Sequence, residues 1–127
     1  ITETLDNFSN NSQIYIALVT RGYPQDVTAL QAILQRPLAY QYLGAIGSQK
    51  RIRMIHQAVQ QEIPNFYAPI GLDIGALTPE EIAVSITAEL IKVRRGGTGL
   101  SLCDRLEHSK SSKVHIAELL YAKLPQF

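Results

Sequence analysis

The feature of this sequence that most constrains its fold is a repeated order of short apolar run, turn and helical pattern. Residues 14–19 (IYIALV) form a continuous apolar run with β-branched members, which is typical of a strand buried on both faces of a parallel sheet. Residues 21–24 (RGYP) break the run, and apolar residues at helical spacing follow until Pro37. Asp26 falls in the first turn of this helix, where an acidic residue is favourable by itself. The first unit is therefore a predicted strand followed by a predicted helix.

The same order begins again further along the chain. Residues 40–46 (YQYLGAI) predict a second strand. Ser48 is a suitable N-cap for a helix over residues 49–62, which carries apolar side chains on one face. Residues 66–68 (FYA) predict a short third strand.

The third predicted helix has the clearest start signal in the sequence. Thr78, Pro79 and Glu81 provide an N-cap, a proline at the first helical position and the acidic partner of a capping box. The helix is expected to reach about Val93. Its wide apolar stripe predicts burial between the sheet and another element. The stripe consists of Ile82, Val84, Ile86, Leu90, Ile91 and Val93.

These units predict an α/β protein, a three-layer Rossmann-like domain with a parallel sheet. No G-x-G-x-x-G occurs, so dinucleotide binding cannot be argued from this chain. The family resemblance described below implies that the first βα unit of such a domain, with its glycine-rich turn, is missing. A sheet without that unit would expose an edge, which a C-terminal helix, a partner subunit or a separate chain is expected to cover. We assign residues 1–95 to the domain and residues 96–127 to a C-terminal extension. A last amphipathic helix is expected there from the spacing of Val114, Ala117, Leu120, Tyr121 and Leu124.

Composition excludes several classes of protein. The chain has 127 residues, of which 46% are apolar and 18% charged, and this indicates one globular core. Its formal charge of +1 gives no general field that would attract nucleic acid or an anionic membrane. No apolar run approaches the ~20 residues of a membrane span, and no signal peptide is visible. Cys103 is the only cysteine and the histidines are scattered, so we expect a cytoplasmic protein without disulfides or a metal site.

Open parallel sheets bind ligands beyond the carboxyl ends of their strands. The turn after the second predicted strand, residues 44–50, has the parts of a phosphate cradle. Gly44 and Gly47 allow the backbone to approach a ligand closely. Ser48 can donate a hydrogen bond, and Lys50 adds positive charge, with its neighbour Arg51, at the start of a helix. A tight turn with a helix cap and two solvated cations explains the same residues equally well.

The turns after the other two predicted strands supply further candidates. Arg21 follows Thr20 and could bind a phosphate or carboxylate with two hydrogen bonds, although a solvated loop arginine is the simpler explanation. Asp73 lies between Gly71 and Gly75. It could bind ribose or pterin groups, bind a cation, or lock the loop through its own backbone.

Four segments of the sequence form a recognisable set. They are ALVTRG at residues 17–22 with Asp26, YLGAIGSQK at 42–50, PIGLDIGA at 69–76, and TPEEIAVSI at 78–86 with Ala88 and Glu89. Together they resemble the C-terminal domain of the xanthine dehydrogenase accessory factor family, known as XdhC/CoxI. The resemblance extends from about Tyr15 to Arg95.

The resemblance implies a Rossmann-like domain of a bacterial-type, dimeric or otherwise homo-oligomeric chaperone that helps molybdenum hydroxylases to mature. Such a protein binds molybdenum cofactor, a pterin with a phosphate, and inserts it into an apo-enzyme of the xanthine dehydrogenase type. No residue is assigned a catalytic or metal-binding role. The implied cofactor-binding residues are Thr20, Arg21, Gly44, Gly47, Ser48, Lys50, Gly71 and Asp73.

Two other functions stay open at this point. An NAD(P)-dependent oxidoreductase is compatible with the fold, but the sequence lacks the glycine-rich fingerprint. A non-catalytic dimerisation module with a vestigial ligand site is the third possibility. Tyr23 stands where relatives often carry a histidine, and residues 96–127 match no family segment.

Overall fold

The computed structural model describes residues 5, 7 and 13–110, with side chains described as far as residue 106. The chain divides into two compact units, Ile1–Gly97 and Thr98–Phe127. The second unit contains helix α5 (Leu102–Lys110), which the sequence pattern did not indicate. The amphipathic helix expected from Val114 onward lies outside the described residues.

A parallel sheet forms the centre of the first unit. Its strands β1 (Ile14–Leu18), β2 (Tyr40–Ala45) and β3 (Phe66–Tyr67) lie in the order β1-β2-β3, and both pairings are parallel. All three predicted strands are therefore confirmed. The first ends one residue earlier than expected, and Val19, which we had placed in a buried strand, is 69% exposed.

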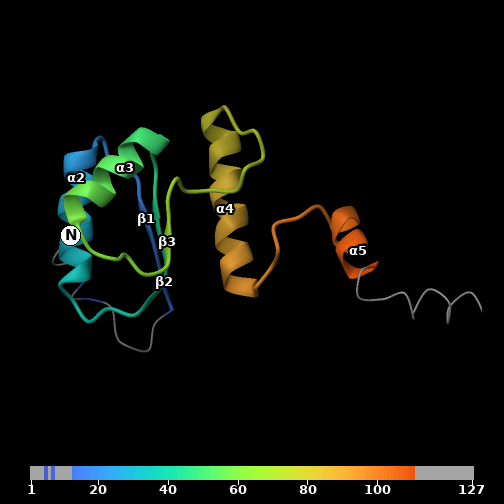
Figure 1. The fold of residues 1–127 in the computed structure, drawn as a ribbon, viewed down its shortest axis with the longest axis horizontal. Coiled ribbons are helices and arrows are strands. Elements are labelled where there is room, and N and C mark those ends of the chain that lie inside the picture. The colour runs from blue at the N-terminus through green and yellow to red at the C-terminus, as the bar shows by residue number, and fades with distance from the viewer. Residues whose placement is uncertain (1–4, 6, 8–12, 111–127) are drawn as a thin grey trace, which may run out of the picture. The chain divides into compact units, whose positions relative to one another are not determined.

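Helices α2 (Tyr23–Leu34) and α3 (Gln49–Val59) pack together on one face of the sheet. Figure 1 shows both on the same side of the strands. This face carries the apolar core, which includes Leu30, Leu43 and Ile55, all fully buried. Such burial is the main driving force for folding.

Helix α4 (Pro79–Arg95) lies on the opposite face of the sheet, so the first unit has three layers (Figure 1). Its capping box is formed as predicted. The Thr78 hydroxyl accepts a hydrogen bond from the Glu81 N–H at 3.2 Å, and the Glu81 carboxylate accepts one from the Thr78 N–H at 3.2 Å. These bonds satisfy N–H groups that have no partner within the helix. The Rossmann-like α/β prediction is confirmed.

The prediction that α4 buries its apolar stripe is wrong for two of the residues in that stripe. Val84 is 60% exposed and Ile91 56% exposed, whereas Ser85 and Glu89 are 5% and 7% exposed. The helix therefore turns a polar side toward the sheet. The reason is that hydrogen-bonding groups of β2 and of the loop before α4 lie on that side.

None of the helices in the described part of the chain combines the length and the apolar character that a membrane crossing requires.

Candidate functional site

Three loops meet at the carboxyl ends of the strands, and we call this region the carboxyl edge (residues 19–22, 46–48 and 68–78). They meet because the three strands are parallel. Backbone hydrogen bonds continue the sheet pairing into the loops. The Ile46 N–H donates to the Leu18 carbonyl at 3.1 Å, and the Ile70 N–H donates to the Ala45 carbonyl at 3.0 Å. The second and third loops are thus each attached to the strand beside them.

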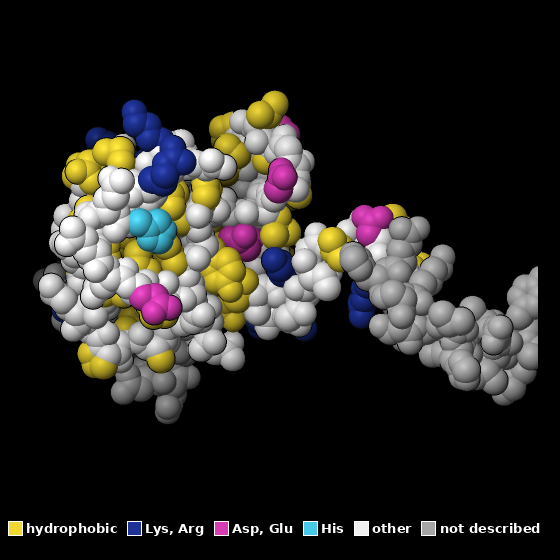
Figure 2. Space-filling view, viewed as in Figure 1, with side chains coloured by type: hydrophobic (Ala, Val, Ile, Leu, Met, Phe, Trp, Pro, Cys, Tyr) yellow, Lys and Arg dark blue, Asp and Glu magenta, His cyan; other side chains and the backbone are white. Residues whose placement is uncertain are grey.

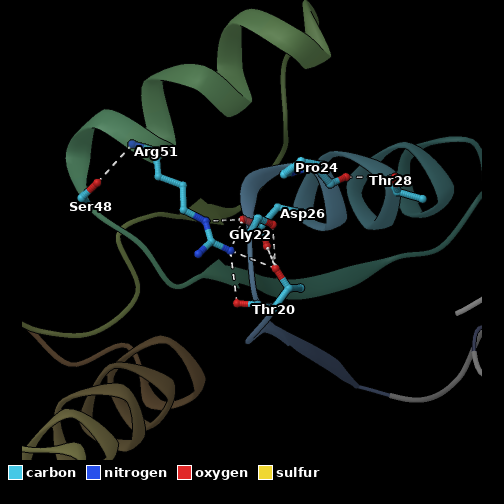
Figure 3. Close-up of polar contacts among 7 residues, drawn as sticks. All are labelled: Thr20, Gly22, Pro24, Asp26, Thr28, Ser48 and Arg51. Carbon is cyan, nitrogen blue, oxygen red and sulfur yellow. Dashed lines mark hydrogen bonds and ion pairs between the residues drawn. The ribbon is translucent and has the colours of Figure 1, made fainter.

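A buried ion pair ties the first of these loops to α3. The Arg51 Nε donates to Asp26 Oδ2 at 2.7 Å, as Figure 3 shows. The Thr20 hydroxyl donates to Asp26 Oδ1 at 2.6 Å and accepts from Arg51 Nη2 at 2.9 Å. Arg51 Nη2 also lies 3.3 Å from the Thr20 carbonyl oxygen. The Asp26 side chain is fully buried and that of Arg51 is 21% exposed.

This ion pair changes the interpretation of three residues. Asp26 is more than a favourable residue in a first helical turn, because it is the buried anion of the pair. Arg51 was grouped with Lys50 as a free cation, but its charge is offset by Asp26. The Thr20 hydroxyl joins the two. Removing one member of such a buried pair costs about 3–5 kcal/mol of stability.

The turn between β2 and α3 leaves the first residues of the helix exposed to solvent. Ser48 is the N-cap, and its Oγ accepts from the Arg51 N–H at 3.2 Å. Gly47 precedes it and is half-buried. The first N–H groups of a helix have no partner within it, so those of Gln49 and Lys50 are available to an anion. The Lys50 side chain is exposed, and Figure 2 shows Lys and Arg side chains gathered over the first turns of α3.

The predicted charged residues of the other loops lie in solvent. Arg21 follows β1 and Asp73 lies in the loop between β3 and α4, and both are exposed, as Lys50 is. Within the described part of the chain, none of these three side chains forms a hydrogen bond or an ion pair. The carboxyl edge and the first turn of α3 beside it therefore offer two cations and one carboxylate without internal partners among the described residues.

Gly44 allows the third loop to pack directly on β2. A Cβ atom at this position would lie 2.5 Å from Ile70 Cδ1 and 2.7 Å from Tyr42 Oη, closer than such atoms approach in proteins. The glycine is buried. The atoms that approach Gly44 closely belong to Ile70 and Tyr42 of the same chain. This glycine therefore allows the third loop to pack on β2.

Helix α4 holds the third loop through its buried polar side chains. Glu89 Oε1 accepts from the Tyr42 hydroxyl at 2.7 Å and from the Gly71 N–H at 3.0 Å. Ser85 Oγ donates to the Leu72 carbonyl at 2.6 Å. Burial, together with the hydrogen bond to Glu89, raises the pKa of Tyr42 well above its ordinary value. Gly71, at φ +104°, is the point at which the loop turns onto the helix.

Sequence reasoning missed Glu89 and Ser85 as members of this network. Both belong to the matched segments, but they were read only as part of an apolar helix. The available signal was their spacing of four residues, which places two polar side chains on one side of a helix. Two polar residues at that spacing among aliphatic neighbours indicate a hydrogen-bonded contact rather than a solvated face.

No metal centre is present among the described residues, because no three His, Cys, Asp or Glu side chains come together there.

Comparison with known proteins gives the family of this fold. The model of the XdhC Rossmann domain matches residues 2–90. The chain belongs to the XdhC Rossmann-domain family. The match includes the three loops of the carboxyl edge, and it confirms the resemblance found in the sequence.

Two curated proteins are similar in sequence to this XdhC domain. A probable xanthine dehydrogenase subunit of Bacillus subtilis strain 168 is 37% identical over 78 residues, which cover 61% of this chain and 23% of that protein. "Uncharacterized protein YqeB" of Escherichia coli strain K12 is 32% identical over 103 residues, which cover 76% of this chain and 18% of that protein. This XdhC chain thus spans about a fifth of the length of these curated relatives.

A solved structure has the same fold. The crystal structure of a xanthine dehydrogenase from Bacillus halodurans superposes with a TM-score of 0.60 at 34% sequence identity. The match covers 74% of this XdhC chain and 28% of that chain.

Proposed function

We propose that this chain is the Rossmann-like part of an accessory protein that matures molybdenum hydroxylases of the xanthine dehydrogenase type. Membership of the XdhC family supports this proposal, as do the names of two similar proteins, which refer to xanthine dehydrogenase. The observation that carries it is the meeting of three family segments at the carboxyl edge. Residues that are far apart in sequence, such as Thr20 and Arg51, are in contact there.

The ligand that we propose for this edge is molybdenum cofactor, bound through its phosphate. The start of α3 offers N–H groups and the positive end of a helix dipole, and both favour a phosphate. Lys50 and Arg21 are exposed cations without an internal partner to neutralise them. Arg51 contributes no net charge, because Asp26 is bound to it. Lys50, at the helix start itself, is therefore the side chain most directly placed for the phosphate.

The residues present fit the organic part of this cofactor. A pterin ring carries N–H groups that can donate hydrogen bonds to a carboxylate. Asp73 on the third loop is such a carboxylate, and it is exposed. The described residues contain no cluster able to hold a metal ion. In this proposal the chain holds the pterin and the phosphate, and the bound cofactor itself brings the redox metal that the client enzyme uses.

The role of the remaining edge residues in this proposal is to keep the loops in place. The Asp26–Arg51 pair fixes the first loop to α3, and Glu89 fixes the third loop to α4. A preformed edge lowers the entropy that a ligand loses on binding. The apo-enzyme client would then receive the cofactor from this exposed side.

Differential scanning fluorimetry tests the ligand. We expect molybdenum cofactor released from a purified molybdenum hydroxylase to stabilise the protein, by about 2.7 kcal/mol at 100 times its dissociation constant. The same preparation treated with phosphatase should stabilise it much less. Inorganic phosphate and NADH serve as comparison ligands. No stabilisation by any of the four would refute the ligand proposal, and stabilisation by NADH alone would favour the oxidoreductase.

The variant Lys50→Ala tests the proposed phosphate contact. We expect it to weaken cofactor binding about fivefold to tenfold at low salt and to make binding less sensitive to salt, because one screened charge is lost. The matched control is Arg53→Ala, which removes an exposed cation from the same helix beyond its first turn. Since the helix-terminal field falls off within that turn, Arg53→Ala should change the affinity less than about twofold. Equal effects of the two variants would contradict the role of Lys50.

A further inference from the structure

Three tyrosine rings form a row across the sheet on the face that α4 covers. The rings of Tyr67 and Tyr42 stack with their centroids 4.7 Å apart and their planes 16° from parallel. Those of Tyr42 and Tyr15 stack at 6.4 Å and 29°. The Tyr42 hydroxyl donates to Glu89 of α4, which places the row on this face. Each strand contributes one ring, so the row runs from β3 through β2 to β1.

The row ends at β1, an outer strand of the described sheet, and a hollow lies beside its last ring. The volume of the hollow is about 400 Å³, which is within the range of pockets that hold small molecules. Its lining comes from the start of β1 and the second half of α4, and it consists of Gln13, Tyr15, Thr87, Leu90, Ile91 and Arg94. Tyr15 is the only ring of the row in this lining, so the hollow lies at the open end of the row.

The lining offers an apolar wall and one cation without a counter-ion. Leu90 and Ile91 supply the wall, and Arg94 supplies the charge. Among the described residues Arg94 forms no ion pair and no hydrogen bond. The last turn of α4 holds three basic residues, Lys92, Arg94 and Arg95, which outweigh the roughly half negative charge of a helix C-terminus. An anion is therefore favoured at this end of the hollow.

We propose that the hollow binds a small planar aromatic carboxylate. Its ring stacks on Tyr15 and continues the row of tyrosines, at the centroid separation of roughly 4.5–7 Å that aromatic pairs prefer. Its carboxylate pairs with the Arg94 guanidinium through two parallel hydrogen bonds. The exposed Gln13 amide can donate and accept one further bond to the ligand. The Thr87 hydroxyl donates to the Ala83 carbonyl at 2.7 Å, so its oxygen can only accept from the ligand.

Simpler occupants match only part of this lining. An aliphatic group would cover Leu90 and Ile91 and leave Arg94 without a counter-ion. An inorganic anion would pair with Arg94 and leave the apolar wall in water. None of the lining residues belongs to the carboxyl edge, and Tyr15 lies toward the opposite end of β1. The inference therefore stands independently of the proposed function.

Titration of the 127-residue chain with indole-3-acetate, followed by heteronuclear NMR, tests the proposal. We expect shifts of the backbone amides of Tyr15 and Arg94 and a dissociation constant of about 1 mM or below. Indole-3-acetamide keeps the ring and loses the charge. Cyclohexaneacetate keeps the charge and loses the aromatic ring. Each of these two comparison ligands should bind about fivefold more weakly, since each makes only one of the two contacts.

Variants separate the two contacts. Arg94→Gln should weaken indole-3-acetate about fivefold and leave indole-3-acetamide unchanged. The matched control Arg95→Gln removes an exposed cation of the same turn that does not line the hollow, and its effect at 0.15 M salt should be less than about twofold. Tyr15→Leu should weaken indole-3-acetate about fivefold, whereas Tyr15→Phe, which keeps the ring, should bind within about twofold of the original chain. Circular dichroism checks that the fold of each variant is unchanged.

Four outcomes would overturn the proposal. The first is no shift with indole-3-acetate up to about 10 mM. The second is shifts centred on Gln49 and Lys50 at the carboxyl edge. The third is equal affinity for the three ligands, which would show adventitious binding. The fourth is a change of the Tyr15 and Arg94 amide shifts with protein concentration in the absence of ligand, because a second copy of the chain would then occupy the hollow.

Discussion

The two faces of the sheet are covered by helices in different ways. On the α2 and α3 face, Leu30, Leu43 and Ile55 are fully buried and make an apolar core. On the α4 face, the buried side chains of the helix are polar: Ser85 donates to the Leu72 carbonyl at 2.6 Å and Glu89 accepts from Tyr42 at 2.7 Å, while aliphatic side chains of α4 such as Ile86 are only partly buried. Burial is non-directional, whereas hydrogen bonds are directional. The first face therefore supplies stability, and the second sets the position of α4 and the loop before it.

Core truncation should give the largest loss of stability if this contrast is correct. We expect Leu30→Ala to lower the free energy of unfolding by about 2–5 kcal/mol, because it removes apolar contacts and leaves a cavity. The matched change on the other face is Val84→Ala, which shortens an exposed side chain and should cost no more than about 0.5 kcal/mol in the monomer. Urea unfolding followed by circular dichroism measures both. Similar losses would show that the two faces do not differ as described.

Changes at Glu89 should separate hydrogen bonding from simple packing on the α4 face. Glu89→Leu leaves the Tyr42 hydroxyl and the Gly71 N–H without their acceptor, and we expect a loss of about 1–3 kcal/mol. Both donors bind the same oxygen, so the amide oxygen of Glu89→Gln can accept from both. The glutamine variant should therefore lose less than about 1 kcal/mol. Amide hydrogen exchange at Gly71 should accelerate in the leucine variant only, and equal acceleration in both would contradict the acceptor role.

The smallest of these changes in the free energy of unfolding is expected from the ionisation of Tyr42 at alkaline pH. The folded protein holds the pKa of Tyr42 above its ordinary value, while the unfolded chain ionises near pH 10. As the pH rises past 10, the unfolded state therefore loses this proton first, and stability falls. Tyr42→Phe removes this contribution, about 1.4 kcal/mol at pH 11 relative to pH 8. The difference between the two stability profiles reports it, because the raised pKa of Tyr40 affects both proteins. Parallel profiles would show that Tyr42 ionises alike in both states.

The sequence was sufficient for the elements of the first unit and insufficient for the contacts between them. Strands, turns and the capping box at Thr78 depend on residues that are close in sequence, so the local sequence pattern predicts them. The pairing of Asp26 with Arg51 joins residues 25 positions apart, and no local pattern contains such information. The orientation of α4 differs from the prediction because the stretch from Ile82 to Val93 holds more aliphatic than polar residues, which suggests an apolar contact. The sheet below presents the Tyr42 hydroxyl, and a hydrogen-bond acceptor such as Glu89 satisfies it better than an aliphatic side chain.

The fit between Gly44 and Ile70 also limits which residues position 44 can take. A side chain at residue 44 would occupy the space that Ile70 fills and would meet the Tyr42 hydroxyl. We therefore expect a larger residue at position 44 to require a smaller one at position 70 and a displaced Tyr42 hydroxyl. A strand position and a loop position are in this way tied to one another.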